Sequence, residues 1–181
     1  IENSGERMLA KSLISQLGAE VEVYHSFRWL AESQKGTLHE GECDFVVLDP
    51  SNGLLFIEVK GGTLRYVQEK DGWERLLEDG RKHILKKSPF DQCSRNMFTL
   101  LERIQKERPF IGLRELPFTF GYAVAFPHSR YEGTLPMGIH RDLLLDDSKC
   151  EDLKRAIQAI FDRWRRQVHP PMRTTEMDGV R

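Results

Sequence analysis

The chain has 181 residues, of which 39% are hydrophobic and 30% are charged, and its formal net charge is -1. These values predict one globular domain with a real core, and they exclude a disordered chain. No apolar stretch approaches the roughly 20 residues that span a bilayer. Three widely spaced cysteines and the lack of a secretory leader predict reduced thiols and a cytoplasmic protein. Because the first residue is Ile1 and not Met, we expect a piece of a longer protein.

Charge is distributed unevenly along the chain. Residues 1–62 carry 5 basic and 10 acidic side chains, whereas residues 63–114 carry 12 basic and 8 acidic ones. This is not the pattern of a protein that coats nucleic acid uniformly. It fits a site where carboxylates hold a cation beside bases that hold an anion, but charge alone favours two ordinary solvated surfaces.

The first half of the sequence predicts one helix followed by strands. Apolar residues at helical spacing between Ser4 and Leu17 indicate the helix, and the glycine that follows ends it. The alternating segment 20–27 indicates a strand, and Trp29 to Gly41 is expected to be a loop. Two β-hairpins follow, the first with strands 43–48 and 54–60 and the second with strands 63–68 and 73–77.

The second half alternates helices with a buried strand. A helix is expected from Pro89 to about Glu107, and 118–126 is apolar enough to be a strand buried on both faces. A last amphipathic helix is expected over about 150–168. The segments expected to lack regular structure are the basic stretch 79–88, the loop 127–142 and the loose tail or linker 169–181. Helices that alternate with strands in this way can cover a mixed sheet on both sides, so we expect one α/β domain over 1–168.

The first hairpin carries the residues with the clearest chemistry. Asp44 begins one apolar strand, and Glu58 and Lys60 leave the same face at the end of its partner. Pairing the strands about their turn brings two carboxylates and an ammonium to one edge of the sheet. Two convergent carboxylates suit a hard cation such as Mg²⁺ or Mn²⁺, and a fixed lysine beside it could neutralise charge on a phosphate. The alternative is a plain ion pair between Glu58 and Lys60.

Four blocks of this sequence, in order, resemble the nuclease-related domain (NERD) family of the PD-(D/E)XK nuclease superfamily. The blocks are Gly5-Glu6, Glu42 to Leu48, Gly53 to Gly61, and Ser88 to Gln92 with Asn96. The resemblance implies a restriction-endonuclease-like core of αβββαβ type, with a mixed central sheet flanked by helices. One departure is that Cys43 precedes Asp44, where the superfamily's name has proline.

The resemblance also implies a role for each matched residue. Asp44 and Glu58 would be metal ligands, joined by Glu6 from the first helix and by the backbone carbonyl of Val59. Lys60 would be the catalytic lysine. Gln92 would lie over the site from its helix, so the implied catalytic set is Asp44, Glu58, Lys60 and Gln92.

A basic stretch before the Gln92 helix is a candidate for contacts with a nucleic-acid backbone. An ordinary exposed loop explains it equally well. The residues assigned to nucleic-acid binding are Arg81, Lys82, Lys86, Lys87 and Asn96, and Arg65, Arg75 and Arg95 are further phosphate candidates.

The sequence therefore predicts a nuclease domain that needs one or two Mg²⁺ or Mn²⁺ ions and cleaves nucleic acid, with DNA as the expected substrate. By the same resemblance, we expect it to be a module of a larger DNA-repair protein such as a nuclease fused to a helicase. The alternatives are a non-catalytic module that guides DNA to a partner helicase, and an interaction domain that docks through the last helix. No membrane partner is expected.

Overall fold

The computed structural model describes residues 4–32, 38–77 and 79–181. Its helices are α1 (Ser4–Gln16), α2 (Pro89–Ile104), α3 (Asp147–Glu151), α4 (Leu153–Trp164) and α5 (Thr174–Val180). Its strands are β1 (Glu22–Glu32), β2 (Leu38–Asp49), β3 (Gly53–Val59), β4 (Thr63–Val67), β5 (Gly72–Leu76), β6 (Lys82–Ile84), β7 (Thr119–Phe126) and β8 (Leu144–Asp146). Within the described residues, no helix is both long and apolar enough to cross a membrane.

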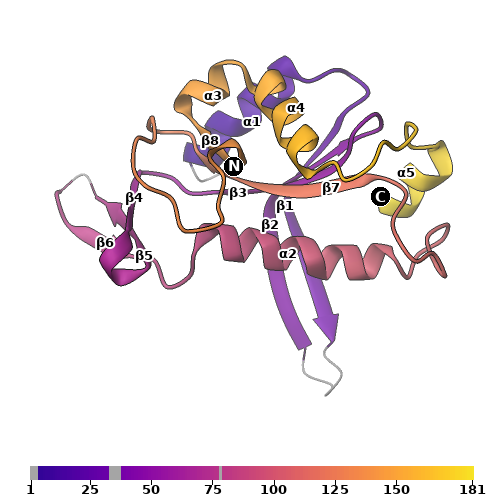
Figure 1. Cartoon of the computed structure of the whole chain (residues 1–181), viewed down its shortest axis with the longest axis horizontal. Helices are drawn as coiled ribbons and strands as arrows, with labels where there is room; N and C mark the ends of the chain where they lie inside the picture. The colour runs from indigo at the N-terminus through magenta and orange to yellow at the C-terminus, as the bar shows by residue number, and fades with distance from the viewer. Residues whose placement is uncertain (1–3, 33–37, 78) are drawn as a thin grey trace.

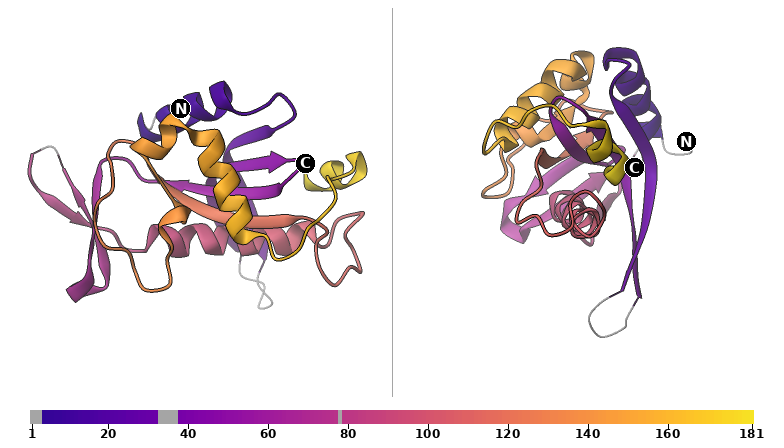
Figure 2. Two further views of the ribbon diagram at one scale, coloured as in Figure 1. Left: turned by 45° about the horizontal axis from the view of Figure 1, so that its top comes forward. Right: turned by 90° about the vertical axis from the view of Figure 1, so that its right-hand side faces the viewer.

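A five-stranded mixed sheet forms the centre of the molecule. Its strand order is β1-β2-β3-β7-β8, with antiparallel pairing from β1 to β3 and parallel pairing from β3 to β8. Helix α2 covers one face, and α1, α3 and α4 lie on the other (Figures 1 and 2). The elements α1, β1, β2, β3, α2 and β7 follow in the order αβββαβ. The expected α/β fold with a mixed sheet flanked by helices is confirmed.

The β2–β3 hairpin lies at the middle of this sheet. All seven residues of β3 are buried, because the strand has neighbours on both edges and helices over both faces. Its turn brings Asp49 opposite Gly53. Gly53 has φ +122°, and a Cβ there would lie 1.9 Å from the carbonyl oxygen of Thr119, so only glycine fits. The hairpin expected from the sequence is confirmed.

The prediction of a loop over 29–41 is wrong for most of that range. Strand β1 continues to Glu32 and β2 already begins at Leu38, and the residues between them lie outside the described part of the chain. The pair projects beyond the sheet as a long hairpin (Figure 1). Trp29 pairs with Gly41, where a Cβ would lie 2.2 Å from the indole ring. The indole packs on its partner strand, and this contact is not visible in a local hydrophobic pattern.

A second, three-stranded sheet has the order β4-β5-β6. Its first two strands are the expected second hairpin. Strand β6 was expected to lack regular structure, because all three of its residues are exposed and show no alternation. Trp73 of β5 anchors this sheet to the body, with ring centroids 5.8 Å from Phe90 and 5.4 Å from Phe126.

The C-terminal quarter differs most from expectation. The last helix was expected to continue to about residue 168 with Val168 on its apolar face, but α4 ends at Trp164 and Val168 is 89% exposed. The tail expected to be loose carries α5 and packs on the body. The backbone N–H of Met172 donates to the carbonyl of Pro50 at 2.7 Å, and Arg181 pairs with Glu22 of β1. Strand β8 and helix α3 were also missed, since each is at most five residues long.

Candidate active site

Two carboxylates and a lysine meet at the end of the β2–β3 hairpin opposite its turn. The register pairs Phe45 with Ile57, so one step further Asp44 of β2 faces Glu58 of β3. The backbone N–H of Val59 donates to Asp44 Oδ2 at 2.7 Å, which fixes that carboxylate against the neighbouring strand. The pairing of β2 with β3 therefore brings these side chains together, as expected from the sequence.

Lys60 connects the hairpin to helix α2. Its Nζ donates to Glu58 Oε1 at 2.5 Å and to Oε1 of Gln92 at 3.3 Å. Gln92 lies in the first turn of α2, so that helix places the amide over the lysine, as the resemblance implied. The lysine side chain is 18% exposed, whereas that of Glu58 is only 1% exposed. The ammonium thus stands between a buried carboxylate and solvent.

The electrostatics of the two carboxylates oppose ionisation. Burial raises the pKa of Glu58 to about 7, the negative charge of Asp44 adds to the rise, and Lys60 opposes it. Burial also raises the pKa of Asp44 to about 6, against the hydrogen bond from Val59. Oε2 of Glu58 is buried without a hydrogen-bond partner among the described residues. Ionised carboxylates in such a place need a nearby positive charge.

Glu6 reaches the same neighbourhood from α1. Its charge contributes to raising the pKa of both Asp44 and Glu58. Its Oε2 lies 2.7 Å from Nε2 of His25 on β1. The sequence reasoning missed His25, because only the pairing of β1 with β2 reveals that position. The next residue, Ser26, has φ +52°, an unusual backbone conformation for a residue with a side chain.

The residues present fit a hard divalent cation. Among the described residues, no three acidic, histidine or cysteine side chains form a ready-made ligand group. The donor chemistry nevertheless suits Mg²⁺ or Mn²⁺, since Asp44 and Glu58 offer carboxylate oxygens and one of those oxygens is buried without a partner. Val59 lies between Glu58 and Lys60, and its carbonyl as a ligand stays a prediction.

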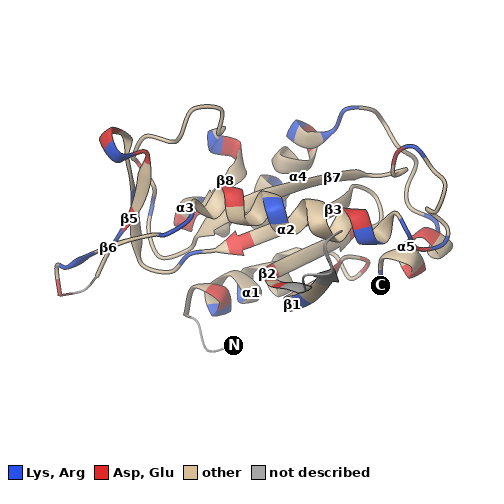
Figure 3. Cartoon of the chain, turned by 90° about the horizontal axis from the view of Figure 1, so that it is seen from below, with Lys and Arg blue, Asp and Glu red and all other residues tan. Residues whose placement is uncertain are grey.

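The residues predicted to contact nucleic acid lie in different environments. Arg81 is engaged by Asp79, with Nε 2.6 Å from Oδ2, whereas Lys82, Lys86 and Lys87 are exposed. Asn96 is buried, and its Nδ2 donates to the carbonyl oxygen of Glu42 at 2.7 Å. That amide ties α2 to β2, which is a structural task. Figure 3 shows basic positions on β6 and on α2.

Comparison with known proteins gives one family. The model of the nuclease-related domain, NERD, matches residues 1–127 of the 181 residues, which include every residue of the cluster described above. No curated protein and no solved structure matches the chain significantly. Because the match covers well over half of the chain, the protein belongs to the nuclease-related domain family.

Proposed function

We propose that this domain is a metal-dependent nuclease that hydrolyses phosphodiester bonds in nucleic acid, with DNA as the expected substrate. The observation that carries the proposal is the Asp44–Glu58–Lys60 cluster, in which Glu58 is buried and its Oε2 has no partner among the described residues. Membership of a nuclease-related family supports the reaction class. A structural ion pair alone would not require a second carboxylate beside the first.

The side chains divide the work by their chemistry. Asp44 and Glu58, with Glu6 and the Val59 carbonyl, would hold one or two Mg²⁺ or Mn²⁺ ions. When bound, such an ion supplies Lewis-acid stabilisation of phosphate oxygens and a more acidic water. Lys60 keeps a positive charge where negative charge develops on the phosphate, and it can hydrogen-bond the attacking water.

Gln92 and His25 would act on this cluster indirectly, by positioning Lys60 and Glu6. The Gln92 amide oxygen accepts from Lys60 and limits where the ammonium can lie. His25 contacts Glu6 and so limits where that carboxylate can lie. A fusion to a helicase and a role in DNA repair stay predictions.

The test is cleavage of single-stranded, duplex and forked DNA with Mg²⁺, Mn²⁺ or EDTA. Wild type is compared with Lys60→Ala and Asp44→Ala, and Lys154→Ala on α4 is the control for loss of a lysine outside the site. We expect cleavage that needs the metal, is lost in both site variants and persists in the control. Thermal unfolding checks that each variant is folded.

The opposite result is equally informative. If no form cleaves any substrate while DNA binding is intact and insensitive to both site substitutions, the nuclease proposal is wrong. The non-catalytic module that guides DNA to a partner would then be the better description.

A further inference from the structure

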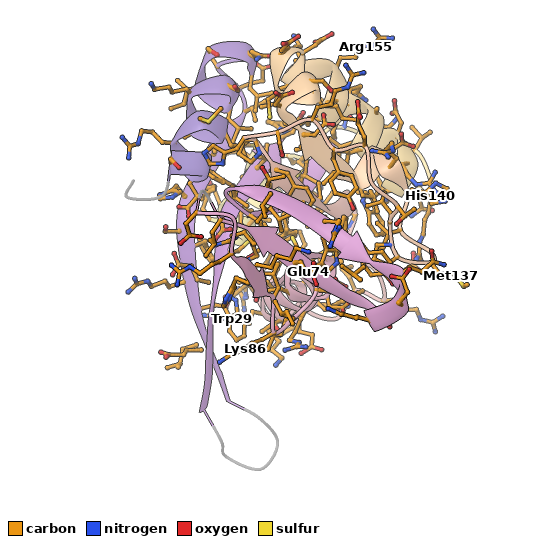
Figure 4. The ribbon with its side chains drawn as sticks, turned by 90° about the vertical axis from the view of Figure 1, so that its left-hand side faces the viewer. Trp29, Glu74, Lys86, Met137, His140 and Arg155 are labelled. Atoms are coloured by element: carbon orange, nitrogen blue, oxygen red, sulfur yellow. The ribbon has the colours of Figure 1, made fainter. Side chains whose placement is uncertain are left out.

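A pocket of about 480 Å³ lies between the β1–β2 hairpin and helix α2. Its hairpin wall is formed by Trp29 of β1 and residues 40–42 of β2. Its helix wall is formed by Gln92 and Arg95, with Lys87 just before the helix. Figure 4 shows Trp29 on the side of the hairpin that faces the body of the molecule.

The pocket adjoins the candidate active site through one shared residue. Gln92 lines the pocket and also accepts a hydrogen bond from Lys60. A group that enters the pocket therefore meets a side chain that also contacts the lysine of the candidate active site. This adjacency distinguishes it from the pocket beside α5, whose lining includes none of these residues.

The two walls carry opposite charges. Lys87 and Arg95 are exposed, and neither forms an ion pair within the described residues, in contrast to Arg81 with Asp79. The hairpin wall carries the carboxylates of Glu40 and Glu42, and Oε2 of Glu42 lies 3.4 Å from Nε of Arg28. Phosphate would therefore be held on the helix wall, and the hairpin wall would suit groups that donate hydrogen bonds, such as the amino groups of bases.

Trp29 supplies a second, independent observation. The residue is 8% exposed and lines the pocket, yet its Nε1–H is buried without a partner among the described residues. Gly41 beneath it lets the ring lie against the strand. Buried donors in folded proteins nearly always have an acceptor. A carbonyl oxygen or ring nitrogen of a base in the pocket would provide one if the indole turned its N–H toward the pocket.

We propose that this pocket is a subsite for one unpaired nucleotide beside the phosphate to be cleaved, so that the domain acts on single-stranded nucleic acid or on unpaired ends. The proposal rests on the function proposed above. The volume is in the range of pockets that enclose a small ligand. A base of a duplex reaches such a pocket only when it leaves the stack, so the subsite would favour an unpaired nucleotide.

The first experiment measures binding in EDTA, where metal-dependent cleavage cannot occur. Fluorescence anisotropy compares a single-stranded DNA, the RNA of the same sequence, a blunt duplex and a duplex with a single-stranded overhang. The variants are Lys87→Gln/Arg95→Gln and Trp29→Phe. The matched control is Lys11→Gln/Lys154→Gln, which neutralises two exposed lysines on α1 and α4.

We expect wild type to bind single strands and overhangs about tenfold more tightly than the blunt duplex, and the pocket double variant to lose that preference. Trp29→Phe should weaken single-strand binding about threefold, through the lost N–H. An oligonucleotide with a terminal 5-iodouracil should photo-crosslink to the peptide that contains Trp29. The DNA and RNA probes show which sugar the subsite accepts.

The outcomes separate this inference from the nuclease proposal. Equal binding of blunt duplex and single strands, or a pocket variant that behaves like the control, overturns the subsite even if the domain cleaves DNA. Loss of single-strand preference only in the pocket variant, in a domain that never cleaves, supports the subsite and rejects the nuclease.

Discussion

Each end of the β2–β3 hairpin carries an acidic side chain, and the two side chains differ in how fully they are hydrogen-bonded. At the turn, the Asp49 carboxylate accepts hydrogen bonds from the N–H groups of Ser51 and Asn52 and from the Asn52 side chain, at 2.8, 3.1 and 2.9 Å. At the far end, Glu58 is more deeply buried and one of its oxygens has no partner among the described residues. The carboxylate at the turn therefore has hydrogen-bond donors, whereas the carboxylate at the far end has none for one of its oxygens. A buried polar atom without a partner is typical of a ligand-binding or catalytic site.

The largest effect is expected when the carboxylate at the far end, Glu58, is neutralised. Glu58→Gln keeps the size of the side chain but removes its negative charge. We expect metal-dependent cleavage to fall on the order of 10³-fold, because the cluster loses a ligand and the partner of Lys60. The measurement is the single-turnover cleavage rate, with circular dichroism to confirm folding. A loss of less than about tenfold would contradict a catalytic role for Glu58.

The next largest effect concerns stability in the metal-free protein. The pKa of Glu58 is raised to about 7 from 4.5, so the folded state holds this proton more tightly than the unfolded state. Stability from this group is fully present below about pH 4.5 and is lost as pH rises through 7. We expect a loss of roughly 3 kcal/mol from this carboxyl between those limits.

Urea unfolding in EDTA at a series of pH values measures this change. Glu58→Gln should flatten the decline between pH 5 and pH 8, relative to wild type. Adding Mg²⁺ at the upper pH should raise the melting temperature of wild type more than that of the variant. Parallel pH curves for the two proteins would contradict the assignment of the decline to Glu58.

Much of the site could be predicted because it is local in sequence. Asp44, Glu58 and Lys60 lie in one hairpin, so strand alternation and the turn that ends in Asn52-Gly53 were enough to bring them together. The matched blocks then extended the site to Glu6 and Gln92. Neither step needed knowledge of how distant segments pack.

What the sequence did not show depends on distant contacts. His25 joins the site only when β1 pairs with β2 and α1 packs beside them. Helix α5 has few apolar residues, and it is held by Met172 against Pro50 and by Arg181 against Glu22. Such partners are more than 100 residues apart and leave no periodic signal. The hairpin beyond Trp29 was missed although its strands are close in sequence, because the packing of Trp29 against Gly41 is not visible in a local hydrophobic pattern.

The smallest expected effect comes from the satisfied end of the hairpin. Asp49→Ala removes the acceptor for three hydrogen bonds in the turn, and we expect a loss of about 1–2 kcal/mol in the free energy of unfolding. Asp49→Asn keeps an acceptor oxygen and should lose less. Cleavage per folded molecule should be unchanged in both, because this carboxylate lies at the turn, away from Lys60. Urea unfolding and cleavage rates at matched folded concentration test this, and a fall in cleavage beyond about threefold would show that the two ends of the hairpin are not independent.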